Sequence, residues 1–337
     1  MAWKSLLKKK LIMLFETVEV LVKGLVVVLI LFGAAAYMTF CERVLMARMQ
    51  LRLGPNRVGP LGLLQPIADG IKLLCKESFQ PDNVDTFVYW LAPGISLFTA
   101  LFAFVLIPVG GTVEMFGRPI GLYIADVNGG ILFLLAFSSL AVYGIVLAGW
   151  ASDSRYSLLG GLRGTAQMIS YEIPMGISLL TVVMAAGTLS LPAIVEAQAD
   201  RWFIWTNPVG FIIYLITAFA ETNRAPFDLP EAEQELTGGY HTEYGGMKFA
   251  VFFLAEYVNI LAVSAIAVTL FLGGWHGPWD IPVVWFLLKV AAFVFFFMWV
   301  RATLPRFRYD QLMSFGWKVL IPIATVNLII TAFFTLV

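Results

Sequence analysis

The chain has 337 residues, of which 60% are hydrophobic and only 13% are charged, and its 22 basic and 22 acidic residues cancel. Soluble domains have a charged fraction of about 25%, so this composition, with a mean hydropathy of +0.84, excludes an ordinary soluble protein. It predicts an all-α, polytopic membrane protein that is embedded in a lipid bilayer and has no nucleic-acid partner.

Eight stretches have the length and apolar character of transmembrane helices. A bilayer core of about 30 Å needs about 20 helical residues; seven runs of about that length carry no charged residue, and an eighth contains only Lys289. In chain order, the predicted spans are 24–41, 86–113, 127–152, 173–195, 202–220, 257–279, 281–300 and 319–337. We expect them to form a single membrane domain, residues 1–337.

Residues 1–23 form a charged leader before the first span. A basic start followed by an apolar run is also typical of a signal peptide. Glu16, Glu19 and Lys23 interrupt the region where the apolar core would begin, which favours a first transmembrane helix. No organelle presequence is evident, and we expect the inner membrane of a bacterium.

The positive charges between the spans are distributed unevenly. The connections that follow the odd-numbered spans contain 14 lysines and arginines, whereas the opposite connections contain only Arg118 and Arg201. The positive-inside rule therefore places the first group in the cytoplasm and both termini on the outer side. The lysines of the leader oppose this orientation.

The first long connection, residues 42–85, contains an arginine-rich turn and a surface helix. Two Gly-Pro pairs predict a sharp change of direction, among the arginines Arg43, Arg48, Arg52 and Arg57. Apolar residues then recur at helical spacing from Leu63 to Cys75, which predicts an amphipathic helix on the membrane surface. This helix could cover the mouth of a chamber or serve as a packing strut.

An acidic loop, residues 221–248, separates the fifth and sixth spans. Its carboxylates face Arg224 as a fixed positive charge and are Glu221, Asp228, Glu231, Glu233, Glu235 and Glu243. Acidic residues at the edge of a bilayer are costly, so this cluster indicates proton or cation handling, or a surface for a partner. Alternatively the loop is solvated, with Asp228 as the N-cap and Glu231 in the first turn of a helix; this leaves the other acids unexplained.

Two further carboxylates occur at the edges of predicted spans. Glu172 precedes the fourth span and Glu256 precedes the sixth, so the topology brings both to the membrane face of Glu221. Closely spaced acids raise one another's pKa values and share protons, as a proton path requires. For Lys289 in the seventh span, we expect a snorkelling side chain in preference to a buried pair with a carboxylate.

Several kinds of site are excluded by the sequence. Cys41 and Cys75 are isolated, so a zinc or iron–sulfur site within the chain is not expected. His241 and His276 fall on opposite sides of the predicted membrane and cannot ligate one haem. We find no nucleotide-binding glycine motif and no catalytic nucleophile, so any electron carriers must belong to partner proteins.

The motifs resemble those of the H-type membrane subunit of respiratory complex I, the proton-pumping NADH:quinone oxidoreductase. The resemblance covers essentially the whole chain, and its strongest blocks are RLGPNRVGP (52–60), GWAS, RYSLLGGLR and AQMISYE (149–172), the acidic loop through EYGGMKF (221–249), AEY (255–257) and RATLPRFRYDQ (301–311). One departure is Val44, where the family pattern leads us to expect a charged residue after Glu42 and Arg43.

The resemblance implies that electrons from NADH pass through FMN and iron–sulfur clusters in hydrophilic partner subunits. The quinone tail would enter this chain from the lipid between helix 1, the surface helix and helix 6. The arginines implied to shape the quinone chamber or dock a peripheral quinone-site subunit are Arg43, Arg48, Arg52, Arg57, Arg301, Arg306 and Arg308. The carboxylates implied to couple quinone reduction to proton movement toward other membrane subunits are Glu172, Glu221, Asp228, Glu231, Glu233, Glu235, Glu243 and Glu256.

Three other classes of protein compete with this interpretation. The homologous subunit of a membrane-bound hydrogenase or a ferredoxin-linked complex shares the fold, but the GPNRVGP block and the long acidic loop favour the quinone enzyme. An ion-coupled transporter would be expected to show internal repeats, and we detect none. A pure membrane anchor would leave the acid cluster without a purpose.

Overall fold

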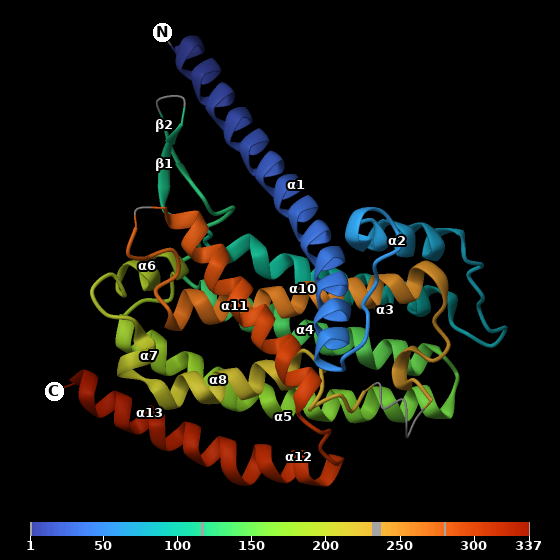
Figure 1. The fold of residues 1–337 in the computed structure, drawn as a ribbon. Coiled ribbons are helices and arrows are strands. Elements are labelled where there is room, and N and C mark those ends of the chain that lie inside the picture. Colours follow the sequence, from blue (N-terminus) through green and yellow to red (C-terminus); the bar gives the residue numbers. More distant parts are fainter. Residues whose placement is uncertain (1, 116–117, 231–236, 280, 337) are drawn as a thin grey trace.

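The computed structural model describes residues 2–115, 118–230, 237–279 and 281–336, and it confirms the all-α membrane architecture (Figure 1). Within these residues, seven helices are long and apolar enough to cross a membrane. They are α1 (Ala2–Met49), α3 (Thr86–Leu106), α4 (Gly130–Ala151), α5 (Arg155–Ala186), α10 (Gly246–Phe271), α11 (Pro282–Thr303), and the continuous run of α12 (Tyr309–Phe315), a π-helical turn (Gly316–Leu320) and α13 (Ile321–Leu336).

The predicted fifth span is divided into two helices, α7 (Phe203–Thr206) and α8 (Pro208–Glu221). The division falls at Asn207, whose side chain accepts a hydrogen bond from the Gly210 backbone N–H at 3.0 Å. Pro208 then occupies the first helical position, where its missing N–H costs nothing. Helix α8 has 14 residues and is about 21 Å long, so it is shorter than a full bilayer core.

Two spans begin earlier than the charge-free runs predict. Helix α5 starts at Arg155 and ends at Ala186, followed by Gly187 with φ +68°, whereas the prediction began at residue 173. Helix α10 starts at Gly246, whereas the prediction began at residue 257. In both cases, helical residues before the predicted start include ionisable side chains that contact other elements.

The surface helix is present as α2 (Gln65–Cys75), in which no residue is buried. Arg43 at the end of α1 donates to Asp69 of α2 at 2.6 Å. Helix α2 also contacts α10, and α1 contacts both of them. In the turn before α2, Gly62 has φ +81°, and a Cβ there would lie 2.2 Å from the Pro55 carbonyl oxygen, so this position requires glycine.

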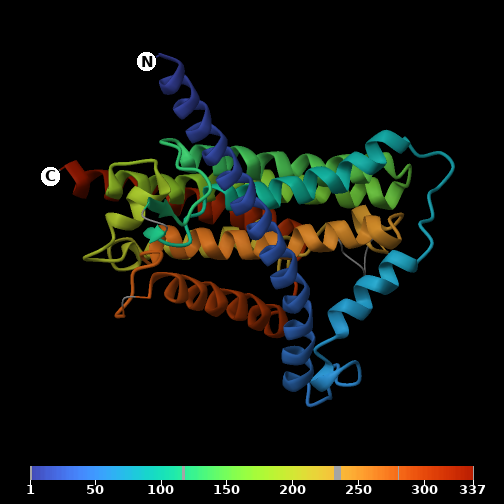
Figure 2. The ribbon, with the colours of Figure 1, turned by 90° about the horizontal axis from the view of Figure 1, so that it is seen from above.

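A short hairpin and a short helix lie at the opposite end of the spans. Strands β1 (Thr112–Met115) and β2 (Arg118–Gly121) pair antiparallel, with Thr112 opposite Gly121, and α6 spans Leu191–Glu196. The Lys23 ammonium donates to the Gly121 carbonyl at 2.8 Å, so the hairpin is attached to α1. Figures 1 and 2 both show α1 crossing the other long helices obliquely, with its N-terminal part extending beyond them.

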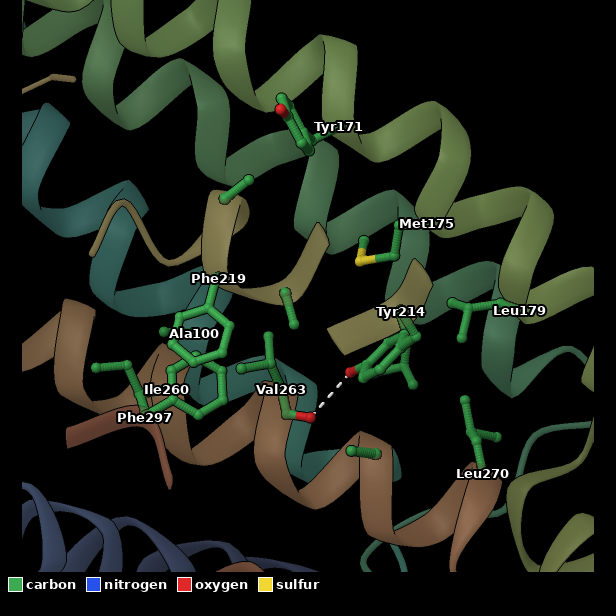
Figure 3. Packing of buried hydrophobic residues seen from close by; sticks show 14 of the residues in the cluster. Ala100, Tyr171, Met175, Leu179, Tyr214, Phe219, Ile260, Val263, Leu270 and Phe297 are labelled. Carbon is green, nitrogen blue, oxygen red and sulfur yellow. Dashed lines mark hydrogen bonds between the residues drawn. The ribbon is translucent and has the colours of Figure 1, made fainter. Parts of the chain in front are cut away.

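Helices α5 and α10 form the interior of the bundle, and α8 packs between them and α11. Tyr214 of α8 donates from its hydroxyl to the Val263 carbonyl of α10 at 2.8 Å, and Phe219 stacks on Phe297 of α11 at 3.9 Å between centroids (Figure 3). Glycines allow closer contacts elsewhere: a Cβ on Gly160 of α5 would lie 2.8 Å from Gly239, which begins the 3₁₀ turn Gly239–His241.

Lys289 does not snorkel, and this expectation from the sequence is wrong. Its side chain is buried and lies 4.4 Å over the ring of Trp202. The ammonium donates to the carbonyls of Leu272, Gly274 and His276 at 2.6, 3.0 and 2.7 Å. These carbonyls belong to the turn that follows α10, so Lys289 binds backbone acceptors just beyond the C-terminus of the helix, where a positive charge is favourable.

Candidate functional site

The structure brings together three carboxylates of the membrane-spanning region, from three helices. Glu172 lies in α5, Glu221 is the last residue of α8, and Glu256 lies in α10. The sequence predicted that they would lie at the same membrane face, without requiring that they touch. Glu221 directly precedes the acidic loop, and Glu256 pairs with Arg224 of that loop.

Two of these carboxylates contact neighbouring hydroxyls of α4. Ser138 donates to Glu221 Oε1, and Ser139 donates to Glu172 Oε1. In the part of the chain that the structure describes, Glu221 Oε2 is buried and has no hydrogen-bond partner. Such an oxygen needs a donor from elsewhere or a proton of its own.

A cavity of about 100 Å³ lies between α3, α4, α5, α8 and α10. Glu221 and Glu256 both line it, together with the polar residues Ser138, Asn259 and Thr99. One water needs about 10–15 Å³ of such volume and two to four polar partners, so the cavity has room for several waters. The two carboxylates can therefore be connected through hydrogen-bonded water.

Glu256 also belongs to a buried ionic cluster, which we define as Glu42, Arg224, Glu256, Tyr257 and Arg301. Arg224 pairs through Nε with Glu256 and through Nη1 with Glu42, the latter at 3.4 Å. Tyr257 donates to Glu42 Oε2 at 2.5 Å, and Arg301 pairs with the other Glu42 oxygen. The cluster joins α1, α10, α11 and the acidic loop.

The charge of Arg224 is held by its partners. Burial by itself would lower the pKa of Arg224, but Glu256, Tyr257 and Glu42 outweigh it, and the pKa of the guanidinium lies above its ordinary value. The guanidinium also lies 4.5 Å over the ring of Tyr257. A buried cation that loses one of these partners becomes an uncompensated charge, which is costly.

Sequence reasoning did not assign Glu42 to the site, although its side chain is only 3% exposed. The first predicted span ended at residue 41, so Glu42 was assigned to the connection 42–85. Helix α1 continues to Met49, and this keeps Glu42 on a helix facing α10 and α11. The apolar residues after Arg43 could have indicated that the helix continues.

The described part of the acidic loop is folded against the bundle. Asp228 lies beside Arg306, which donates to the Asp228 backbone carbonyl. Burial raises the pKa of Asp228 to about 6, against the opposing effect of Arg306. Glu243 is half-buried, and its backbone carbonyl accepts from the Tyr89 hydroxyl at 2.6 Å. Glu231, Glu233 and Glu235, and with them the predicted helix start after Asp228, lie outside the described residues.

The predicted arginines divide into two groups. Arg301 and Arg306 are half-buried and contact Glu42 and the acidic loop. The other arginines are exposed at the surface: Arg43, Arg48, Arg52, Arg57 and Arg308. Of these, Arg43 pairs with Asp69, and Arg308 lies 4.0 Å from Asp310.

The two histidines lie at opposite ends of α10. His241 precedes α10 and His276 follows it, and the 26 residues of this helix span about 39 Å. His241 stacks on Tyr240 and Phe249, and burial lowers its pKa to about 4, so it is neutral near pH 7. Both cysteines are free and exposed. Among the described residues, no group of three His, Cys, Asp or Glu side chains could hold a metal ion.

Together, the fold and the site define a polytopic helical membrane protein with ionisable residues gathered inside one end of the bundle. The model of a protein family described as NADH dehydrogenase matches residues 22–332. The chain therefore belongs to this family, as an H-type membrane subunit of NADH-quinone oxidoreductase.

Similar proteins carry the same description. The H-type subunit of the NADH-quinone oxidoreductase of Protochlamydia amoebophila (strain UWE25) is 80% identical over 306 residues, which cover 91% of this chain and 94% of that protein. One of the H-type subunits of Geobacter metallireducens is 54% identical over 311 residues, with coverage of 92% and 94%. The H-type subunit of Thermomicrobium roseum is 53% identical over 318 residues, with coverage of 91% and 93%.

Proposed function

We propose that this chain couples the reduction of a membrane quinone to proton translocation through its half-buried carboxylates Glu172, Glu221 and Glu256. The observation that carries this proposal is that Glu221 and Glu256 line one polar cavity while Arg224 links Glu256 to Glu42. A proton arriving at the cavity and a charge change near Glu42 would thus act on the same ionic cluster. FMN and iron–sulfur clusters would belong to partner subunits in a bacterial inner membrane.

The quinone tail would approach between α1, α2 and α10. These three helices contact one another, and α2 presents apolar side chains such as Ile67, Ile71 and Leu74 without burying them. This arrangement supports an entrance that is open to lipid. Arg301 and Glu42, where α1 meets α11, would form the polar end of the chamber.

The turn before α2 would dock a peripheral subunit at the quinone site. Leu51, Leu53 and Leu61 are 97%, 88% and 83% exposed, far more than the lipid-facing leucines of α1. They alternate with the exposed Arg52 and Arg57. Apolar and arginine side chains together are typical of the centre of a protein interface.

The test is Glu221→Gln in the assembled complex. Glutamine keeps the size and can accept from Ser138, but it cannot release a proton. We expect NADH-to-ferricyanide electron transfer to be retained, while quinone reduction coupled to proton pumping in proteoliposomes falls by at least about 10-fold.

Glu196→Gln is the matched control, because Glu196 is an exposed glutamate on α6 outside the cluster. It should pump like the wild type. Wild-type pumping per quinone reduced in Glu172→Gln, Glu221→Gln and Glu256→Gln, each fully assembled, would refute the coupling role.

A further inference from the structure

Two adjacent serines lie in the middle of the apolar helix α4. Consecutive side chains on an α-helix point about 100° apart, because the helix has about 3.6 residues per turn. Ser138 accordingly reaches Glu221 of α8, and Ser139 reaches Glu172 of α5. Two consecutive residues of α4 therefore contact two carboxylates that belong to different helices.

Ser139 has two acceptors within reach. Its Oγ contacts Glu172 Oε1 and also lies 3.0 Å from the Leu135 carbonyl oxygen, one turn earlier in α4. A serine hydroxyl carries one proton and can donate to only one of these oxygens at a time. The choice between them depends on whether Glu172 carries a proton.

The two protonation states of Glu172 require opposite hydrogen-bond directions. An ionised carboxylate only accepts, so the Ser139 hydroxyl must donate to it. A protonated carboxyl group can donate to Ser139 Oγ, and the serine proton then turns to the Leu135 carbonyl, a bond that serines often form within helices. The serine keeps its own proton throughout, and only the O–H bond of the carboxyl group forms or breaks.

Ser138 differs because, within the described chain, its hydroxyl donates to Glu221 and not to a carbonyl of its own helix. It binds Glu221 Oε1. The other carboxylate oxygen, Oε2, is buried and has no hydrogen-bond partner among the described residues, and Glu221 lines the cavity. Ser138 thus fixes the orientation of Glu221, whereas the Ser139 hydroxyl can change its acceptor when the charge of Glu172 changes.

We propose that Ser139 is a positioning residue whose hydroxyl reverses its hydrogen-bond direction whenever Glu172 gains or loses a proton, while Ser138 holds Glu221 at the cavity. This inference rests on the proposed function, since it assigns a partner to a carboxylate of the coupling path. It gives the Ser139 hydroxyl and the Glu172 carboxyl group, both half-buried, a hydrogen-bond partner in either protonation state of Glu172.

The test compares Ser139→Ala with Ser139→Thr in the assembled complex. Alanine removes the donor to ionised Glu172, so coupled proton pumping should fall about 10-fold, the ratio expected for one hydrogen bond to a charged group. The pH profile of pumping should also move to higher pH, because the ionised form has lost a donor. Threonine retains a hydroxyl and should restore both quantities.

Ser264→Ala is the control, because Ser264 is a buried serine of α10 that donates to the Ile260 carbonyl at 2.7 Å. It should keep the wild-type pH profile. A wild-type profile in Ser139→Ala, alongside loss of coupling in Glu172→Gln, would overturn this inference and leave the proposed function intact. Normal pumping in Glu172→Gln would instead refute the role of that carboxylate, and this inference with it.

If Ser139→Ala does not assemble, Ser139→Cys replaces it, since a thiol is similar in size but a weaker donor. A shifted profile in the assembled Cys variant would support the inference. An unchanged profile would contradict it.

Discussion

Individual residues show how the site stabilises charges inside the membrane. Glu42 and Arg224 are 3% and 6% exposed, and each has more than one partner of opposite charge or a hydroxyl donor. Replacing one member of such a cluster leaves another charge uncompensated. We therefore expect that replacing these residues by others of similar size will test their function, whereas alanine substitutions will mainly destabilise the protein.

Asp228 provides a pH dependence that can be measured. Its pKa rises from an ordinary value of 3.8 to about 6 because it is buried. A raised pKa in the folded chain means that folding favours the protonated form, so this contribution to stability is present below about pH 4 and is lost as the pH rises through about 6.

We predict that Asp228→Asn removes this pH dependence. Between about pH 5 and pH 7.5, the wild-type complex should lose thermal stability relative to the Asn variant. Melting temperatures of the purified complexes, measured across this range, provide the check. A constant difference between the two proteins at all pH values would show that Asp228 does not titrate there.

The sequence could indicate the position of an acid where that acid interrupts or borders an apolar run. Glu172, Glu221 and Glu256 interrupt or border apolar runs, so their convergence could be inferred from topology alone. Their hydroxyl partners could not be predicted, because Ser138 and Ser139 are common residues in membrane helices, and their contacts depend on the rotation of α4. The pairing of Arg224 with Glu256 likewise depends on how the acidic loop folds back.

At the scale of helices, the spans were predicted well as apolar runs and less well at their boundaries. Charged residues were taken to end a span, but helices α5 and α10 continue through them. Lys248, in the first turn of α10, is buried and lies 4.5 Å over the ring of Tyr89 and 4.4 Å over that of Trp90. Cation–π contacts of this kind cannot be predicted from sequence, because they depend on where α3, which carries both rings, packs against α10.

The contact between α5 and the Gly239–His241 turn leads to a prediction about packing. A methyl group on Gly160 would lie 2.8 Å from Gly239 Cα and from the Tyr240 backbone nitrogen. Gly160→Ala should therefore separate these backbones and destabilise the protein by roughly 1–3 kcal/mol. The expected result is a lower melting temperature of the assembled complex.

Gly176→Ala is the matched control on the same helix, because a Cβ at Gly176 meets nothing within 4 Å. It should be neutral or slightly stabilising, since alanine favours the helix. Equal melting temperatures for the two variants would contradict the proposed role of the close backbone contact.

At the scale of the whole molecule, ionisable residues and apolar surface are segregated. The ionic cluster, the acidic loop and the arginine-rich turn lie at one end of the bundle, while the hairpin and Lys289 lie toward the other. The exposed leucines and phenylalanines of α1, α11 and α13 face outward, as lipid contact requires. The 14 lysines and arginines of the predicted cytoplasmic connections lie at the end of the ionic cluster, and Arg118 and Arg201 lie at the opposite end.

We predict that both termini lie on the outer side of the membrane, from the loop charges and from the eight spans predicted in the sequence, of which the fifth is the pair of short helices α7 and α8. A reporter fused after Val337 should be accessible from the outer side only. Labelling of intact cells compared with inverted vesicles tests this. A reporter that reacts only from the cytoplasmic side would reverse the orientation of every loop.

Lys289 has a mechanical consequence for α10. Three bonds from one ammonium clamp the chain just beyond the C-terminal end of this helix, whereas its other half carries Glu256, whose pairing with Arg224 depends on charge. Because these hydrogen bonds restrain one end of α10, rotation of the helix about that end is favoured over translation along the helix axis. We therefore expect any movement of α10 to be larger at Glu256 than at the end that Lys289 holds.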